Sequence, residues 1–219
     1  GQCGTLTGAT PAAAAAANVA NISRVTTFLQ NGAKQTNEGL DLVVNYRQNH
    51  MFDSDVRLGI GGSATRVFKN SITDVSVAGV LVQRGFNGVG LLNYQSALYP
   101  VPKWKGQAFV DFGFGPIDMR LQGNYTGGLH DQRADTNSGP FALNNDLGGV
   151  VLTQGANIRR FVTADYNIQI QLPANVVLTG TVANLFDRDP PFAREDYNYE
   201  PFIGNPLGRT VKVGASVKF

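Results

Sequence analysis

The sequence predicts an all-β protein whose antiparallel strands form an up-and-down meander, of the kind that crosses a membrane as a β-barrel. Three observations predict this fold class. Apolar and polar residues alternate over about eight segments, the connections between segments are short on one side and long on the other, and aromatic residues gather near the short connections. Successive side chains of a strand point to opposite faces, and roughly ten residues let a tilted strand cross a bilayer.

Length and composition exclude several other classes of protein. The chain has 219 residues, of which 42% are hydrophobic and 16% charged, which argues against disorder. A formal net charge of +2 is too small to indicate a nucleic-acid partner. No stretch approaches the ~18 consecutive apolar residues of a transmembrane helix, and no signal peptide is visible. Because the chain starts at Gly1, we expect a processed or truncated product.

The alternating segments follow one another along the chain. Residues 22–29 form the weakest of them. The others are 40–47, 55–60, 104–112, 117–126, 163–172, 176–182 and 209–219. In the last segment, valines at 211, 213 and 217 alternate with lysines at 212 and 218. Each segment therefore has one mostly apolar face and one polar face.

The polar faces carry charged residues, which decides which side of the sheet meets water. These residues are Asp41, Arg47, Arg57, Lys105, Asp111, Asp118, Arg120, Asp165, Lys212 and Lys218. Burying so many charges without full pairing would cost several kcal/mol each. We therefore expect this face to meet water, either in a lumen or in bulk solvent.

The connections and the aromatic residues favour a membrane barrel over a soluble sandwich. Short connections are expected at 48–54, 115–116 and 173–174, and long ones at 69–103, 127–158 and 187–205. Outer-membrane barrels have short turns on one rim and long loops on the other. Tyr46, Phe112, Phe114 and Phe219 lie near the short-turn ends of their strands, where an interfacial girdle of aromatic residues would lie.

Four short motifs occur in a fixed order along the chain. The segment 182–188 contains Asn184, Leu185, Phe186 and Asp187, and resembles the "NLFD" signature of TonB-dependent outer-membrane receptors. The ending 208–219 is similar to their final strand. The segment 37–42, after the Asn-Gly-Ala turn at 31–33, and the proline-led segment 99–104 resemble two further strands of the same family. The resemblance covers nearly the whole chain.

This resemblance implies that residues 1–219 are the C-terminal part of a receptor barrel of about 22 strands, and that the N-terminal plug domain is not in this chain. It implies a location in the outer membrane of a Gram-negative bacterium. The implied partners are outer-membrane lipid, the TonB complex, reached through the missing N-terminal part, and the barrel-assembly machinery. That machinery would read a C-terminal signal formed by Val211, Val213, Val217 and Phe219. The single cysteine, Cys3, is either a free thiol or half of a pair, and the resemblance is compatible with a partner cysteine upstream of Gly1.

The function implied by the resemblance is TonB-energised uptake of a scarce nutrient, such as a ferric siderophore, a vitamin or a saccharide. The candidate ligand-facing residues are charged and aromatic residues of the long loops: Arg133, Asp135, Arg194, Tyr197 and Tyr199. We expect no cofactor, no metal site and no catalytic residue. A polar loop explains the D-x-N-x-G pattern at 135–139 better than a calcium site, because position twelve is Asp146 and no flanking helix is expected.

Other functions are compatible with parts of the pattern. The main alternative is an autonomous eight-stranded outer-membrane protein with a structural or adhesive role. An outer-membrane enzyme would need a histidine beside a serine or an acid on one rim, and His50 and His130 are expected on opposite rims. A soluble ligand-binding barrel conflicts with the charges on the inner face. The glycines in segment 59–64 match a dinucleotide-binding pattern but lie within a predicted strand.

Overall fold

The computed structural model describes residues 33–51, 54–77, 80–94, 96, 98–134 and 155–217. In this part of the chain there is no α-helix. The seven long strands are β1 (Gln35–Met51), β2 (Val56–Ile72), β6 (Trp104–Phe114), β7 (Ile117–Thr126), β10 (Phe161–Leu172), β11 (Val176–Ala183) and β12 (Thr210–Val217). The predicted segment 22–29, Cys3 and Phe219 lie outside the described residues.

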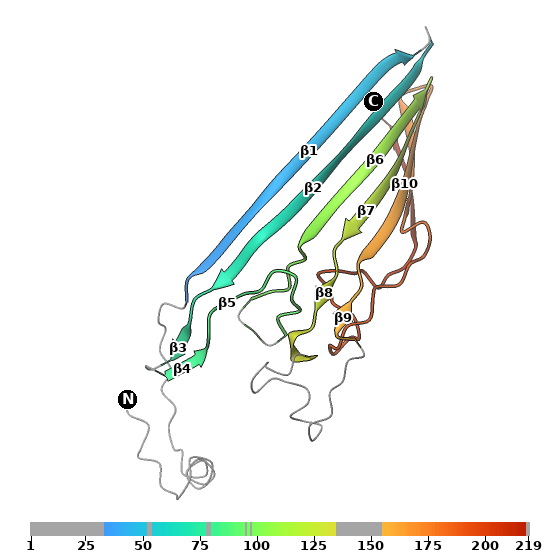
Figure 1. Ribbon diagram of the computed structural model, residues 1–219. Helices are drawn as coiled ribbons and strands as arrows, with labels where there is room; N and C mark the ends of the chain where they lie inside the picture. Colours follow the sequence, from blue (N-terminus) through green and yellow to red (C-terminus); the bar gives the residue numbers. More distant parts are fainter. Residues whose placement is uncertain are drawn as a thin grey trace, which may run out of the picture. The chain divides into compact units, whose positions relative to one another are not determined.

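The long strands form one antiparallel sheet in the order β1-β2-β6-β7-β10-β11-β12 (Figure 1). Each long strand therefore pairs with the next one along the chain. A short strand, β5 (Phe86–Asn87), adds to the end of β2 and makes the sheet eight-stranded. Two small sheets pair β3 (Val75–Val77) with β4 (Val80–Gln83), and β8 (Leu129–His130) with β9 (Asn157–Ile158). The predicted all-β, antiparallel meander is confirmed.

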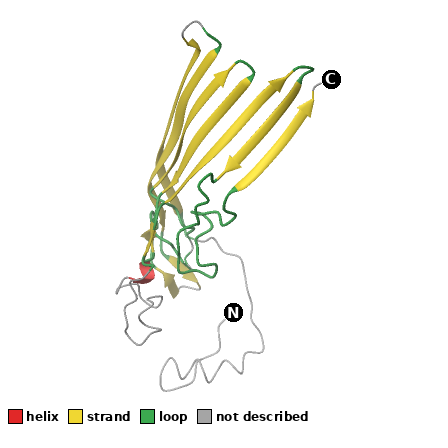
Figure 2. Ribbon diagram, turned by 90° about the vertical axis from the view of Figure 1, so that its right-hand side faces the viewer, coloured by secondary structure: helices red, strands yellow, loops and turns green. Residues whose placement is uncertain are grey.

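The connections are as asymmetric as the sequence indicates. β6 and β7 are joined by Gly115 and Pro116, and β10 and β11 by residues 173–175. Gly115, Ala174 and Asn175 have positive φ angles of 50°, 62° and 55°, which tight hairpin turns between twisted strands favour. At the opposite end of the sheet lie the described parts of the long connections, residues 73–77, 80–94, 98–103, 127–134, 155–160 and 184–209 (Figure 2).

β1 and β2 are longer than the segments that their alternation predicts. Each has 17 residues, and β2 runs through the glycines at 59, 61 and 62 to Ile72. These glycines pair with Arg47, Asn45 and Val44 of β1. The glycine-rich stretch is therefore part of a strand, as expected, and does not form a dinucleotide-binding loop. Glycine adds no side chain to the alternating pattern, which is why periodicity alone ends this strand too early.

The register of the strands carries the alternation across the whole sheet. One row consists of Tyr46, Ile60, Val110, Leu121, Tyr166, Val182 and Val211, one from each long strand. Neighbouring rows on the same side are also formed mainly by aliphatic, aromatic or small residues. We call this side of the sheet the apolar face.

The apolar face is exposed. Leu42 and Val44 in β1 are each 59% exposed, and Val213 in β12 is 86% exposed. The buried hydrophobic cluster of the protein lies instead among the long connections, where it contains Leu92, Leu129, Ile158, Ala193 and Ile203. The fold thus leaves the largest apolar surface of the sheet without a protein layer over it in the described part of the chain.

Candidate functional site

The side of the sheet opposite the apolar face is polar, and we call it the polar face. One of its rows consists of Arg47, Gly59, Asp111, Arg120, Asn167, Thr181 and Lys212. The charged residues predicted to share one wet face therefore do share it wherever the structure describes them. Lys218 lies outside the described residues.

Two ion pairs join strands on the polar face, one between the adjacent β6 and β7 and one from β2 across β6 to β7. Arg120 of β7 donates two hydrogen bonds to Asp111 of β6. Its Nε donates to Oδ1 at 2.6 Å, and a terminal nitrogen donates to Oδ2 at 2.8 Å. Its guanidinium also lies 4.1 Å from the ring centroid of Phe109. Arg57 of β2 donates to Asp118 of β7 at 2.9 Å. The Arg120–Asp111 pair is bidentate and joins adjacent strands, a geometry that a single exposed pair lacks.

Amide side chains continue this network toward the long connections. Gln122 donates to Gln107 at 3.0 Å and to Asn124 at 2.8 Å, and Asn124 donates to Asp165 at 2.7 Å. The chain of contacts crosses from β6 through β7 to β10. A face built in this way satisfies its polar groups while staying wet, as the wall of an aqueous channel must.

The polar face is hollowed near the short turns. A cavity of about 930 Å³ lies against it, and its lining includes Arg57, Asp111, Asp118, Arg120 and Asn167. The hollow is open to solvent on the polar side. It offers room and both signs of charge to water or a polar solute.

The three long connections pack on one another at the other end of the sheet. Leu92 of the first donates its backbone N–H to His130 of the second at 2.8 Å. Ala193 and Ile203 of the third complete the hydrophobic cluster with Leu92, Leu129 and Ile158. The loops therefore form a small folded layer with its own core, which the sequence did not predict.

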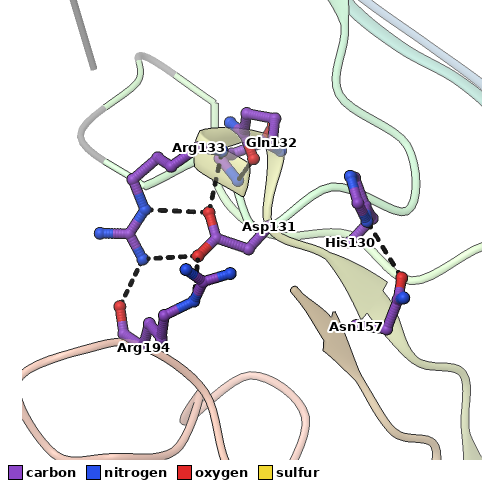
Figure 3. Close-up of polar contacts among 7 residues, drawn as sticks. His130, Asp131, Gln132, Arg133, Asn157 and Arg194 are labelled. Atoms are coloured by element: carbon purple, nitrogen blue, oxygen red, sulfur yellow. Dashed lines mark hydrogen bonds and ion pairs between the residues drawn. The ribbon is translucent and has the colours of Figure 1, made fainter. Parts of the chain in front are cut away.

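One buried carboxylate ties two of these loops together (Figure 3). Asp131, 0% exposed, accepts hydrogen bonds from Arg133 at 2.9 Å on each of its oxygens. Arg194 of the third loop approaches the same carboxylate at 3.3 Å, and its carbonyl oxygen accepts a further hydrogen bond from Arg133. The Arg133 guanidinium also stacks over the Tyr94 ring at 3.9 Å.

A carboxyl group with a displaced pKa lies next to this cluster. Burial raises the pKa of Glu195 to about 8, and its hydrogen bond with the buried Glu200 acts in the same direction. Arg133 acts weakly in the opposite direction. Glu200 itself accepts a hydrogen bond from the Phe202 backbone N–H at 2.9 Å. At neutral pH, Glu195 is therefore largely protonated and able to donate to Glu200.

Aromatic side chains cover the outside of the third loop. Tyr197 is 72% exposed, and its ring centroid lies 6.3 Å from that of Tyr199. Tyr99 of the first loop and Phe202 pack with their centroids 5.6 Å apart and remain largely exposed. Such exposed rings, backed by a folded layer, suit contact with a planar or sugar-like ligand.

The structure separates the predicted ligand-facing residues into two groups. Arg133 and Arg194 come together on Asp131, and both are largely buried, so their charges hold the loops together. Tyr197 and Tyr199 lie together at the surface. Asp135 lies outside the described residues. The sequence analysis missed Asp131 and Glu200, because nothing in the local pattern distinguishes a buried acid from the exposed acids around it.

The first residue of the "NLFD" segment caps the end of β11. Asn184 adopts a positive φ of 53°, and its side chain bonds the backbone of Arg188 through both its amide nitrogen and its oxygen, at 2.8 and 3.0 Å. Its backbone N–H donates to Asp165 of β10 at 2.8 Å, and Leu185 donates to the Ala164 carbonyl at 2.7 Å. This half of the motif fixes the turn onto the neighbouring strand.

The last residue of that segment aligns the entry to β12. Asp187 accepts a hydrogen bond from the Arg209 backbone N–H at 2.7 Å and lies 3.6 Å from the Arg209 guanidinium. Gly208 between them has a φ of +63°, and a Cβ there would lie 2.7 Å from Oδ1 of Asp187. Phe186 is exposed. The motif therefore connects β10, β11 and β12 through its hydrogen bonds. We call residues 184–187 the clasp.

Aromatic residues mark both ends of the apolar face. Phe112 and Phe114 lie on it near the short turns, as predicted. Phe68, Trp104 and Tyr125 form a second group near the long connections, which the sequence analysis did not identify. Val211, Val213 and Val217, predicted to carry the assembly signal, lie exposed on the apolar face of β12.

No group of three potential metal ligands occurs among the described residues. In the same part of the chain, no helix has the length and hydropathy needed to cross a bilayer. His50 lies one residue before the end of β1 at the short-turn side, and His130 lies in β8 among the long connections. No protein-family model, no curated protein and no solved structure matches this chain.

Proposed function

We propose that this chain forms part of the wall of an outer-membrane β-barrel, as the last strands and loops of a TonB-dependent receptor that takes up a scarce nutrient. One observation carries the proposal. Seven consecutive antiparallel strands present an exposed apolar face on one side and a hydrogen-bonded, charged face on the other.

The exposed apolar face needs a partner. Soluble monomers rarely expose contiguous apolar patches larger than a few hundred Å². Burying a side chain such as Leu42, Val110 or Val213 is worth about 1.5–3 kcal/mol, and this face has many of them. The hydrocarbon of a bilayer supplies that environment over the whole width of the sheet, with aromatic residues at both edges of the apolar band.

The polar face supports a water-filled interior. A soluble sandwich would pack one face of the sheet against a second layer. Here the charged face carries the Asp111–Arg120 and Arg57–Asp118 pairs, and the hollow of about 930 Å³ lies against it. Both features fit the inner wall of a barrel that holds water or a plug domain.

The strand order favours a wide barrel over a small autonomous one. β1 and β12 lie at opposite ends of the sheet. Open strand edges are not tolerated in hydrocarbon, so these edges need further strands or each other. A closed barrel of eight strands has an interior that its own side chains fill, whereas the polar face here is hollowed.

The long connections are the ligand-facing part of this proposal. They form a packed layer that presents Tyr197, Tyr99 and Phe202 to solvent, with the half-buried Tyr199 next to Tyr197. Aromatic and polar groups on a rigid support suit a ferric chelate, a vitamin or a saccharide. A catalytic role is not proposed, because His50 and His130 lie at opposite ends of the strands.

The experiment that tests the proposal is to read the coding sequence upstream of the Gly1 codon. We expect, in frame, a signal peptide, a plug-like domain and about fourteen further alternating segments, because about 22 strands close a barrel of this class. A signal peptide directly before Gly1 would contradict the receptor. In that case the small autonomous barrel with a structural or adhesive role would replace it.

A further inference from the structure

Arg66 is a charged side chain on the apolar face, two positions along the β1–β2 ladder from the Glu38–Lys69 ion pair. Arg66 of β2 lies opposite Leu40 of β1 on one side and Trp104 of β6 on the other, in the same alternating set as Ala64 and Ile60. Its guanidinium carbon lies 5.0 Å from the Trp104 ring centroid and 5.9 Å from that of Phe68. Among the described residues no carboxylate pairs with it. The two rings position the cation and leave its charge uncompensated.

Arg66 lies where lipid headgroups would begin. It is ten residues from Val56, which starts β2 at the short-turn end. At about 3.3 Å per residue the distance along the strand is about 33 Å, and a tilt of about 40° reduces it to a height of about 25 Å. That height equals the usual apolar band of an outer-membrane barrel. An arginine costs little at this level, although it would cost about 2–4 kcal/mol at the midplane.

A groove lies on the apolar face beside Trp104, the ring that the Arg66 guanidinium contacts. It has a volume of about 450 Å³, and its lining includes Ala64, Gly106, Ala108 and Gly123, with Trp104 and Tyr125 beside them. These residues come from β2, β6 and β7 and share the apolar face through the register. The groove therefore combines an apolar floor of small residues with aromatic walls, and Trp104 links it to Arg66.

We propose that this groove binds an acyl chain of a membrane lipid whose anionic phosphate headgroup accepts hydrogen bonds from Arg66. The inference rests on the membrane location in the proposed function. Charge complementarity selects the occupant, because Arg66 lies against Trp104, and Trp104 lines a groove with an apolar floor. Arginine presents a fork of donors that matches phosphate oxygens, and its planar group already lies against two rings.

The site contains its own reporter. Trp104 is the only tryptophan of the 219 residues. The complete barrel that contains this chain, with Trp104 kept as its only tryptophan, is refolded into phosphatidylcholine vesicles, and its folding is checked by the gel shift of the unheated protein. Quenching of Trp104 fluorescence is then measured with acyl-brominated phosphatidic acid or acyl-brominated phosphatidylcholine. We expect phosphatidic acid to be preferred about fivefold, the effect of one arginine near an anionic lipid.

Two variants separate the headgroup contact from the groove. Arg66→Gln should remove the preference for phosphatidic acid, whereas Arg47→Gln, on the polar face, should retain it. Gly123→Leu should weaken quenching by both lipids, because the space above Gly123 is open enough for a side chain that fills the groove.

The measurement distinguishes a failure of the proposed lipid site from a failure of the proposed membrane location. Equal quenching of the unsubstituted chain by both lipids, or a preference that survives Arg66→Gln, would overturn the lipid site and leave the membrane location standing. If neither brominated lipid quenches Trp104, the apolar face does not meet lipid. The proposed membrane location then fails, and the lipid site fails with it.

Discussion

Single charged residues decide how the long loops hold together. Asp131 is fully buried and is shared by Arg133 from its own loop and Arg194 from another. Breaking a buried ion pair by removing one partner typically costs about 3–5 kcal/mol, because the remaining charge stays desolvated. The arginines were predicted as ligand contacts on their charge alone. Their position shows that such charges also serve to join loops distant in sequence.

Glu195 makes the loop layer sensitive to pH. Its pKa is about 8 in the folded loops, against an ordinary value of 4.5. Between these values the folded state keeps a proton that the unfolded state has released. Its contribution to loop stability is therefore complete below about pH 4.5 and is lost as pH rises through 8. We expect protection of the Ala193 and Asp131 amides from hydrogen exchange, corrected for intrinsic rates, to fall between pH 5.5 and 8.5.

Two glutamate variants test the source of this pH dependence. Glu195→Gln should flatten the profile, because the amide cannot ionise. Glu38→Gln, which removes an exposed acid paired with Lys69 in the sheet, should leave the profile unchanged. A Glu195→Gln chain that keeps the pH-dependent loss of protection would show that another group is responsible.

At the scale of elements, the turns set the register between strands, and the register places the apolar residues of all strands on one side of the sheet. The 184–187 segment bonds to β10 through Asp165 and to the start of β12 through Arg209. It therefore sets how the last strand enters the sheet. A slip of one residue would turn Val211 and Val213 toward water and Lys212 toward the apolar side.

Asp187 is the residue of this clasp that can be tested most directly. Asp187→Ala removes the acceptor of the Arg209 N–H and should lower the free energy of unfolding of the complete barrel that contains this chain by about 1 kcal/mol. The measurement is urea unfolding in detergent micelles. Asp189→Ala, an exposed neighbour, is the matched control and should change stability little. Equal losses in the two variants would argue against the clasp.

At the scale of the whole molecule, the sheet reverses the arrangement of a soluble protein. Its apolar face is exposed, its polar face is hydrogen-bonded, and the buried hydrophobic cluster lies in the loops. Lipid on one side and water on the other would satisfy all three features. The long connections then need their own core, because no layer of the sheet supplies one.

A lysine placed on each face tests this arrangement. Val110 lies in the middle of β6 on the apolar face, and Gln107 of the same strand lies on the polar face. Val110→Lys should cost about 2–4 kcal/mol near the bilayer midplane and lower the yield of the complete barrel refolded into vesicles. Gln107→Lys should refold nearly as well as the unsubstituted chain. Equal tolerance of the two lysines would contradict lipid contact at Val110. The yield is measured by the shift of folded chain on unheated gels.

The strands could be predicted where their alternation is undisturbed. Segment 117–126 coincides with β7, and segments 163–172 and 176–182 fall within a few residues of β10 and β11. The prediction fell short in β1, where Val43 stands on the polar face, and in β2, where glycines replace side chains. The prediction of a strand from periodicity depends on its side chains. It fails where glycine has no side chain, and where an apolar residue lies on the polar face.

The sequence by itself determined the fold class, the two unlike faces of the strands and the contrast between short and long connections. These features depend on residues close together in the chain. Only the tertiary structure decided that Asp131 meets Arg194, and that Arg66 meets Trp104 above a groove of small residues. Such contacts join residues 38 or more positions apart. They depend on register and on loop packing, and no local pattern encodes either of them.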